Sequence, residues 1–196
     1  MIKFITGPMR SGKSSLLIDL IENNKEIIIP LKPKVDTRDG SFIKSRDGRS
    51  IQAKAWLNNN ELIKDVFLLL IMKYQENIPN KQITVFIDEA HFLDIESVKF
   101  FIEKSEELDF DLVMCGLKWS FLVEKFDVYN ILLGAADTFI EVKAQCELCY
   151  HKNSSEYNIL YSGDVPQFSG DAIQPGDVDY KAVCPDCKDY LISEYK

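Results

Sequence analysis

Residues 7–14, which read GPMRSGKS, have the composition of a phosphate-binding loop. The pattern G-x-x-x-x-G-K-[ST] lets the backbone curl so that successive N–H groups point at phosphate oxygens. The lysine adds a positive charge, and the final serine hydroxyl can bind Mg²⁺. A glycine-containing turn that carries a lysine by chance is the alternative. The candidate nucleotide-binding residues of this loop are Gly7, Pro8, Met9, Arg10, Ser11, Gly12, Lys13 and Ser14.

Two adjacent acids follow an apolar run in the segment VFIDEAHF. Asp88 would lie at the C-terminal end of a central strand, where open α/β sheets bind ligands, and could hold Mg²⁺ through water. Because adjacent strand residues face opposite sides, we expect Glu89 to be free for a different task. That task would be to take a proton from an attacking hydroxyl group or water. A solvated acidic strand end is the alternative.

Four of the five cysteines form two C-x-x-C pairs, CELC and CPDC, with 34 residues between them. Two such pairs predict a structural zinc site with four thiolate ligands, although the gap is longer than is common. Paired redox thiols or unrelated cysteines are the alternatives. The fifth, Cys115, lies in an apolar run and is expected in the core, and His151 is expected at the surface. The candidate zinc ligands are Cys146, Cys149, Cys184 and Cys187.

The elements that must position these residues alternate along the chain. Short apolar runs predict buried strands at 2–6, 26–30, 83–87 and 111–117. Helical spacing of apolar residues predicts helices at 13–24, 60–77 and 94–108, and residues 130–144 suggest a short helix followed by a strand. Such alternation predicts an α/β fold with a mainly parallel sheet and helices on both faces. Residues 31–50 are polar and rich in turn residues, which predicts a mobile loop.

The composition of the chain changes near residue 144, where cysteine pairs and Gly, Pro, Ser and Asp become frequent. We therefore expect a phosphate-binding core at 1–143 and a small zinc-binding domain at 144–196. A length of 196 residues suits one well-cored domain with such an appendage.

The bulk properties exclude several classes of protein. A net charge of −8 and a sequence pI near 4.9 argue against a broad electrostatic grip on nucleic acid, so no stable nucleic-acid partner is expected. No apolar run is long enough to span a bilayer, and the early phosphate loop leaves no room for a signal peptide. We expect a cytoplasmic protein without a membrane partner, whose cysteines stay reduced.

Taken in order, the motifs resemble those of the type II thymidine kinases, the cellular, bacterial and phage-type enzymes. The family's G-P-M-x-S-G-K-S/T stands here at 7–14, and its K-P-x-x-D-x-R stands here as KPKVDTR at 32–38. Its D-E-A/G-Q-F stands here as DEAHF at 88–92, with His91 in place of Gln, and its G/A-L-x-x-x-F as GLKWSF at 116–121. A tyrosine ahead of the second cysteine pair, in GDVDYKAVCPDC, completes the set.

The resemblance implies a RecA-like phosphate-loop core with a small, zinc-ribbon-like lasso domain. It implies that ATP, with Mg²⁺, donates its γ-phosphoryl group to the 5′-hydroxyl of a deoxynucleoside, thymidine above all. Glu89 would be the general base, and Lys13, Ser14 and Asp88 would hold the triphosphate and its metal ion. It further implies a homotetramer.

The resemblance also implies where the nucleoside lies. Residues 163–183 would form the lasso that closes over it. Of the residues that would contact it, Phe121 packs on the base, Tyr180 lies near the sugar, Phe92 belongs to the acid motif, and Asp47 matches an acid of the family's flexible loop. The alternatives are that Phe121 is a core residue and that Tyr180 only pins the lasso. Arg38, Arg46 and Arg49 are either phosphate contacts or solvated loop charges.

Three departures from the family pattern bear on the substrate. An ungapped match places Glu156 and Asn158 where the family has the Thr and Arg of T-x-R-L, and that Thr helps to read thymine. Lys118 replaces an Asp, and LVEKF replaces the basic residues that follow the family's Phe. A carboxylate near the base could select an amino-bearing edge. Two alternatives therefore stay open: a deoxynucleoside kinase of altered base preference, and a phosphate-loop regulatory or DNA-associated protein without kinase activity.

Overall fold

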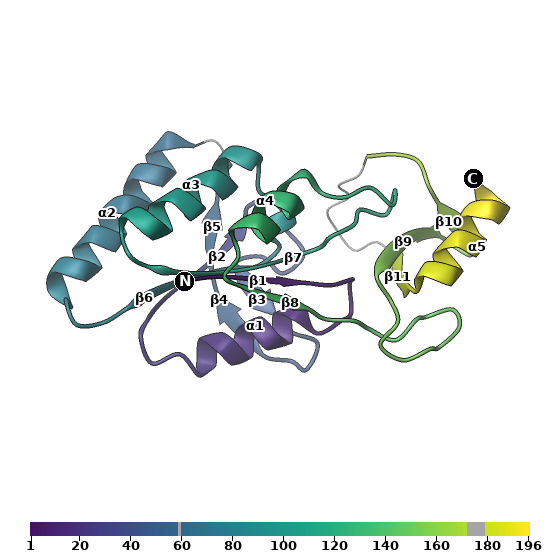
Figure 1. Ribbon diagram of the computed structural model, residues 1–196, viewed down its shortest axis with the longest axis horizontal. Coiled ribbons are helices and arrows are strands. Elements are labelled where there is room, and N and C mark those ends of the chain that lie inside the picture. The colour runs from purple at the N-terminus through teal and green to yellow at the C-terminus, as the bar shows by residue number, and fades with distance from the viewer. Residues whose placement is uncertain (59, 172–178) are drawn as a thin grey trace.

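The computed structural model describes residues 1–58, 60–171 and 179–196. A six-stranded sheet, parallel throughout, forms the centre of its larger part (Figure 1). The strand order is β5-β2-β6-β7-β1-β8. This arrangement confirms the predicted α/β fold. The strands are β1 (Ile2–Thr6), β2 (Ile27–Pro33), β5 (Lys54–Trp56), β6 (Ile83–Ile87), β7 (Asp111–Gly116) and β8 (Thr138–Glu141).

Helices cover both faces of this sheet, as the alternating pattern predicted (Figure 1). Helix α1 (Lys13–Glu22) lies on one face, and α2 (Glu61–Asn77), α3 (Ile95–Glu107) and α4 (Asp127–Ala135) lie on the other. Two side chains cap helix starts: Asn60 accepts the N–H of Ile63 at α2, and Asp94 accepts that of Ser97 at α3. Each face buries its own apolar cluster, so the sheet is held rigidly between two cores.

The prediction of a mobile loop at 31–50 was wrong in part. Strand β2 runs on to Pro33, and a hairpin of β3 (Phe42–Lys44) and β4 (Ser50–Gln52) follows. Pro30 suggested the end of a strand because it lacks an N–H group. The Leu31 carbonyl oxygen, however, accepts the Asp88 N–H at 3.1 Å, so the backbone of Leu31 points toward β6. The backbone nitrogen of Pro30 therefore points to the opposite side, toward β5, and pairing with β5 begins only at Leu31. The proline therefore costs the sheet no hydrogen bond.

The C-terminal part has a sheet of its own, beyond one end of the larger sheet (Figure 1). Its antiparallel strands β9 (Tyr157–Ser162), β10 (Val165–Gln167) and β11 (Asp179–Val183) stand in the order β10-β9-β11 and precede helix α5 (Pro185–Tyr195). A small cluster that includes Ile159, Val183 and Leu191 packs beside the cysteine pairs. Residues 172–178 of the expected lasso at 163–183 lie outside the described residues.

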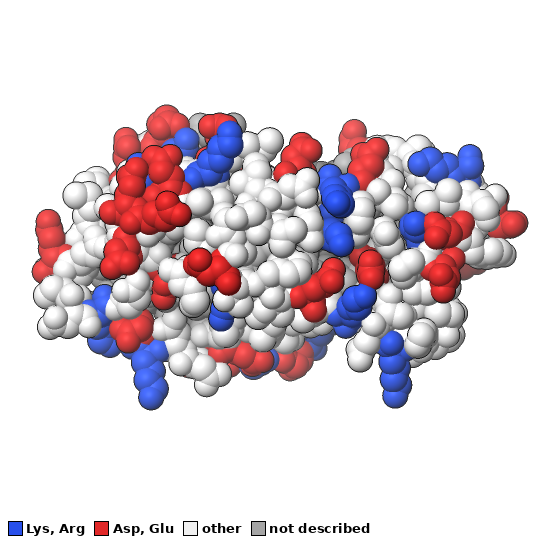
Figure 2. Space-filling view, viewed as in Figure 1, with Lys and Arg blue, Asp and Glu red and all other residues white. Residues whose placement is uncertain are grey.

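Charged side chains of both signs are scattered over the face drawn in Figure 2, and acidic ones gather at one end over α2 and α3. This distribution follows the net charge of −8. None of the helices described is long and apolar enough to cross a membrane.

Candidate functional site

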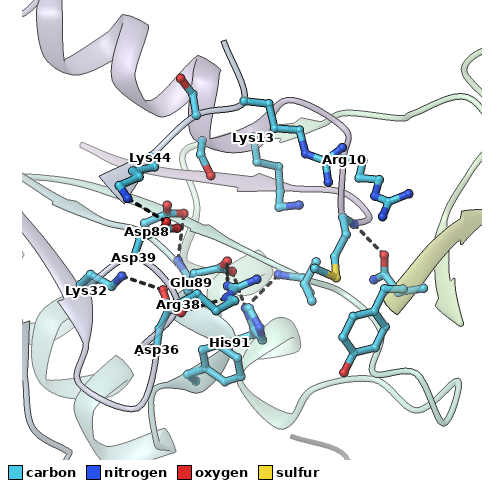
Figure 3. Close-up of a pocket in the computed structure, with 18 of the residues that line it drawn as sticks. Arg10, Lys13, Lys32, Asp36, Arg38, Asp39, Lys44, Asp88, Glu89 and His91 are labelled. Atoms are coloured by element: carbon cyan, nitrogen blue, oxygen red, sulfur yellow. Dashed lines mark hydrogen bonds and ion pairs between the residues drawn. The ribbon is translucent and has the colours of Figure 1, made fainter. Parts of the chain in front are cut away.

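A cavity of about 480 Å³ opens at the carboxyl ends of the central strands, between the larger sheet and the C-terminal part. Its walls come from the phosphate loop, from the segments 32–46, 88–92 and 117–126, and from Asn158 and Tyr180. Figure 3 shows charged side chains of both signs among the residues that line it. A crevice at the carboxyl edge of a parallel sheet is where such folds bind ligands.

The phosphate loop turns back on itself before α1 begins at Lys13. Gly7 has φ of 152°, and a Cβ atom there would lie 2.1 Å from the Val142 carbonyl oxygen, so only glycine fits. Gly12 has φ of 86° and caps the helix. The Lys13 side chain is buried and its Nζ donates to the Pro8 carbonyl oxygen at 2.6 Å. The lysine is thus held across the loop, beside the cavity that it lines.

Asp88 follows β6 directly and is buried beside Cys115. Burial, and then the neighbouring charge of Glu89, raise the pKa of Asp88 to about 7. A cation beside such a carboxylate favours its charged form. Asp88 and Ser14 both line the cavity, and their oxygen atoms are of the kind that Mg²⁺ prefers, so the residues present fit this ion.

Glu89 is separated from Asp88 by a backbone turn rather than by the pleat of a strand, which corrects the sequence-based expectation. Strand β6 ends at Ile87, and Glu89 has φ of 50° and ψ of 39°, a left-handed conformation that is uncommon for a residue with a side chain. Its N–H donates to Asp88 Oδ1 at 2.9 Å. The turn aims the Glu89 carboxylate into the cavity (Figure 3).

Arg38 and His91 flank the Glu89 carboxylate. Arg38 Nη2 donates to Glu89 Oε1, and His91 Nδ1 lies 3.4 Å from Glu89 Oε2. Burial opposes the charged form of Glu89, but the charge that His91 carries in acid, together with the charges of Arg38 and Lys13, lowers its pKa below the ordinary value. Burial lowers the pKa of His91 to about 4, so its ring is neutral at pH 7 and its Nδ1 accepts the Leu117 N–H at 3.3 Å. Glu89 is therefore an ionised carboxylate at neutral pH.

A buried ion pair holds Arg38 in this position. The Asp36 carboxylate accepts a hydrogen bond from Arg38 Nε at 3.0 Å. It also forms an ion pair with Lys32 Nζ at 2.9 Å, in which both side chains are buried. Burial opposes the charge of Asp36, but its two cationic partners lower its pKa. These residues belong to the segment KPKVDTR, whose spacing thus builds a chain of charges that ends at Glu89 (Figure 3).

Aromatic side chains line the same cavity. Phe121 is 2% exposed, and its ring centroid lies 6.3 Å from that of Tyr180 on β11. Phe92, Trp119 and Phe126 also line this cavity. Phe121 is therefore both a buried residue and part of the wall, and an apolar ring system of this kind suits a flat, partly polar ligand such as a nucleobase.

The C-terminal part is bonded to the phosphate loop at two points. Asn158 Oδ1 accepts the Met9 N–H at 2.6 Å. Glu147, which lies between the cysteines of the first pair, accepts a hydrogen bond from the Arg10 side chain. Glu147 also accepts the Ala182 N–H at 2.6 Å, which joins the two cysteine segments. The phosphate loop and the segments that carry the cysteine pairs are therefore parts of a single site.

The four paired cysteines come together at the base of the C-terminal part. Their Sγ atoms all lie within 4.8 Å of one another, and those of Cys149 and Cys184 are 3.8 Å apart. Zn–S bonds of about 2.3 Å in a tetrahedron place sulfur atoms about 3.8 Å apart, so the donor set fits zinc. Burial of Cys146 raises the pKa of its thiol, but hydrogen bonds from backbone N–H groups outweigh this effect and lower the pKa to about 6.

Comparison with known proteins gives the family. A family model described as thymidine kinase matches residues 1–188 of this chain. A thymidine kinase of Bacillus subtilis subsp. natto is 32% identical and covers 94% of this chain and 94% of its own length. That of Pseudothermotoga lettingae is 29% identical over 98% of this chain and 97% of its own, and that of phage T4 is 31% identical over 92% and 91%.

The chain belongs to the thymidine kinase family. It is therefore a nucleoside kinase, an ATP-dependent transferase, which confirms the resemblance that its motifs show. Nearly the whole length of the chain takes part in the match, the cysteine pairs included.

Most of the site residues expected from the motifs of this family meet in the cavity. Met9, Arg10, Gly12, Lys13, Ser14, Asp88, Glu89, Phe92, Phe121 and Tyr180 line it. Gly7, Pro8 and Ser11 shape the loop behind it, where Ser11 Oγ donates to the Pro8 carbonyl oxygen at 2.8 Å.

Asp47 is not among the lining residues of the cavity. Its carboxylate accepts the side chains of Ser45 and Arg49. Arg49 in turn reaches Asp19 and Glu22 on α1, whereas Arg38 and Arg46 line the cavity. In this structure Arg49 is thus a surface charge of the hairpin, and Arg38 and Arg46 are the arginines of this segment that face the site.

Two features of the site escaped the sequence reasoning. One is the contact of Arg38 with Glu89, which joins residues 51 positions apart in the chain. The motif spacing places Arg38 in the same segment as Lys32 and Asp36 but does not reveal its partner. The other is the bond of the Met9 N–H to Asn158: the family match singles out Asn158 and Glu156 but does not reveal this partner. Glu156 pairs with Lys143 at 2.7 Å and does not line the cavity.

Proposed function

We propose that this protein is a thymidine kinase that transfers the γ-phosphoryl group of ATP to the 5′-hydroxyl of thymidine. The observation that carries the proposal is one cavity lined together by a lysine-bearing phosphate loop, an ionised glutamate and a pair of aromatic rings. A phosphoryl donor and a nucleoside placed along this cavity would bring the triphosphate and the hydroxyl group together at Glu89.

In the proposed mechanism, Glu89 is the general base. It takes the proton of the 5′-hydroxyl as the hydroxyl oxygen bonds to the γ-phosphorus and the bond to the bridging oxygen of the ADP leaving group breaks. Lys13 leaves the Pro8 carbonyl and binds phosphate oxygens, and the N–H groups of the loop bind the others. Arg38 keeps Glu89 charged and pointed into the cavity. Mg²⁺, held by Ser14 and Asp88, would neutralise charge on the triphosphate.

The remaining roles follow from position. Phe121 and Phe92 would pack on the nucleoside base, and Tyr180 would lie near the sugar, with the lasso at 163–183 closing the cavity. We further propose that residues 1–143 form the phosphoryl-transfer core and 144–196 a lobe stapled by structural zinc. The five cysteines, all within the described residues, form no disulfide, and cysteines that bind zinc must stay reduced. This suits a reducing compartment, so we place the enzyme in the cytoplasm.

A nucleoside panel tests the proposal. Thymidine, deoxycytidine, deoxyadenosine and deoxyguanosine are each incubated with radiolabelled ATP, Mg²⁺ and the protein, and monophosphate is measured. We expect thymidine to be phosphorylated with the highest kcat/KM. ATP hydrolysis without a nucleoside product, stimulated by DNA, would instead favour a regulatory or DNA-associated protein. Preference for an amino-bearing base would favour the altered-specificity kinase, but the carboxylate of Glu156 is turned to Lys143 rather than to the cavity.

We also propose that the enzyme is a homotetramer, and the outer face of α2 supports this. Leu62, Val66, Leu69 and Met72, spaced along one side of the helix, are 71, 55, 66 and 48% exposed. An apolar stripe of this kind is typical of a contact between proteins. We expect Leu69→Glu to shift the protein toward smaller species in light scattering at equal concentration. Leu133→Glu, at an apolar residue of α4 that is 40% exposed, is the matched control and should leave the assembly unchanged.

A further inference from the structure

Asn158 joins the phosphate loop to the C-terminal part, and it lines the cavity. It lies on β9, opposite Ala182 of β11, and is 2% exposed. Its Oδ1 accepts the Met9 N–H at 2.6 Å. Because a backbone N–H can only donate, the oxygen of the amide is fixed on the Met9 side and the NH₂ group must point away from it.

Among the described residues, this NH₂ group has no partner. Asn158 Nδ2 is buried and finds no hydrogen-bond acceptor within residues 1–58, 60–171 and 179–196, although Asn158 lines the cavity. Two further donors that line the same cavity, Trp119 Nε1 and Ser120 Oγ, are buried without a partner in the same part of the chain. A buried donor without an acceptor is costly, so this end of the cavity is prepared for a ligand that carries acceptors.

Those acceptors belong to a base rather than to phosphate. Of the cationic side chains that line the cavity, Lys32, Arg38 and Lys44 lie near Asp88 and Glu89 in Figure 3, where phosphate charge would be neutralised. Arg10 and Arg46 line the cavity nearer the C-terminal part, where Glu147 pairs with Arg10 and interacts electrostatically with Arg46. Asn158 is neutral and shares the cavity wall with the paired rings of Phe121 and Tyr180. A neutral amide donor beside aromatic rings suits a nucleobase carbonyl oxygen.

Building on the proposed thymidine kinase activity, we propose that Asn158 is a specificity-determining residue that selects a carbonyl-bearing base edge. Its NH₂ group donates to a carbonyl oxygen of the base, and the Met9 N–H prevents the amide from flipping to present its oxygen instead. Thymine meets this donor with a carbonyl. Cytosine carries an amino group in place of one of the thymine carbonyls, and two facing donors leave both unpaired.

Asn158→Asp tests the proposal. The carboxylate can still accept the Met9 N–H but presents an acceptor to the cavity in place of the donor. We expect kcat/KM for thymidine to fall by about 10²-fold or more, and the ratio of kcat/KM for thymidine over deoxycytidine to fall with it. Asn158→Leu, which buries no charge, should also lower this ratio because it removes the donor. Asn130→Asp on the exposed surface of α4 is the matched control and should keep the wild-type ratio.

The outcomes separate this inference from the proposed function. A wild-type protein that phosphorylates no nucleoside contradicts the kinase proposal itself. A wild-type enzyme that prefers thymidine, with variants that lose activity equally on both nucleosides or only raise KM for ATP, would show that Asn158 acts solely by holding the phosphate loop. An active wild-type enzyme that prefers deoxycytidine would equally overturn the assignment of a donor facing a carbonyl.

Discussion

Replacing Glu89 by Gln is expected to lower kcat for thymidine phosphorylation by about 10²–10⁴-fold, the usual contribution of a positioned general base. The amide keeps the shape of the side chain and can remain in the left-handed turn, but it cannot accept the proton of the 5′-hydroxyl. ATP should still bind, because the phosphate loop does not contact this carboxylate directly among the hydrogen bonds found in the described chain.

Steady-state kinetics for thymidine and a direct binding measurement for ATP check this result together. Glu103→Gln, at an exposed residue of α3, is the control and should retain wild-type kcat. Turnover by Glu89→Gln within a few-fold of wild type would remove Glu89 from the role of base. Loss of ATP binding in the same variant would mean that its main task is to anchor Arg38 rather than to move a proton.

The parallel sheet could be predicted because its central strands β1, β6 and β7 are buried on both faces and so appear as continuous apolar runs. All five residues of β6 are buried, and the acids that follow it mark the carboxyl edge of the sheet. Apolar runs do not predict strands whose pairing depends on contacts with residues that are distant in the sequence. The hairpin of β3 and β4 is mostly polar and was expected to be irregular, yet Ile43 is buried against α1 and its neighbours, and pairing across the hairpin follows.

The site shows the same division between local and distant information. The glycines of the phosphate loop can be recognised in the sequence because the backbone geometry demands them at fixed spacing, as the contact of Gly7 with Val142 shows. The ion-pair partners of charged residues cannot be predicted from the sequence in this way. Arg38 finds Glu89, and Arg49 finds acids on α1, although the two arginines lie in the same polar segment. Only the fold decides which of them faces the cavity.

Loss of the zinc site is expected to have the second large effect. In Cys184→Ser we expect zinc content to fall from about one ion per chain to nearly none, and KM for thymidine to rise by about 10-fold or more. The apolar cluster of the C-terminal part is small, and two of its buried members, Cys146 and Cys184, are themselves candidate ligands. Binding of a structural zinc contributes about 10–16 kcal/mol in small zinc domains, so such a cluster cannot replace it.

The nucleoside should be affected before ATP because of where the zinc segments lead. Cys184 directly follows β11, which carries Tyr180 and pairs with β9, which carries Asn158. Loosening these strands withdraws both residues from the cavity, whereas Lys13 and Ser14 are held by the larger sheet and α1.

Metal analysis of purified protein, with kinetics for both substrates, measures these effects. Cys115→Ala is the matched control: Cys115 is buried in β7 and stands outside the four-sulfur group, so this variant should keep about one zinc per chain. Purified wild-type protein without zinc would contradict the four-thiolate site. A zinc-free variant that loses ATP binding as readily as nucleoside binding would show that the bonds of Met9 and Arg10 to the C-terminal part, rather than the larger sheet, hold the phosphate loop in shape.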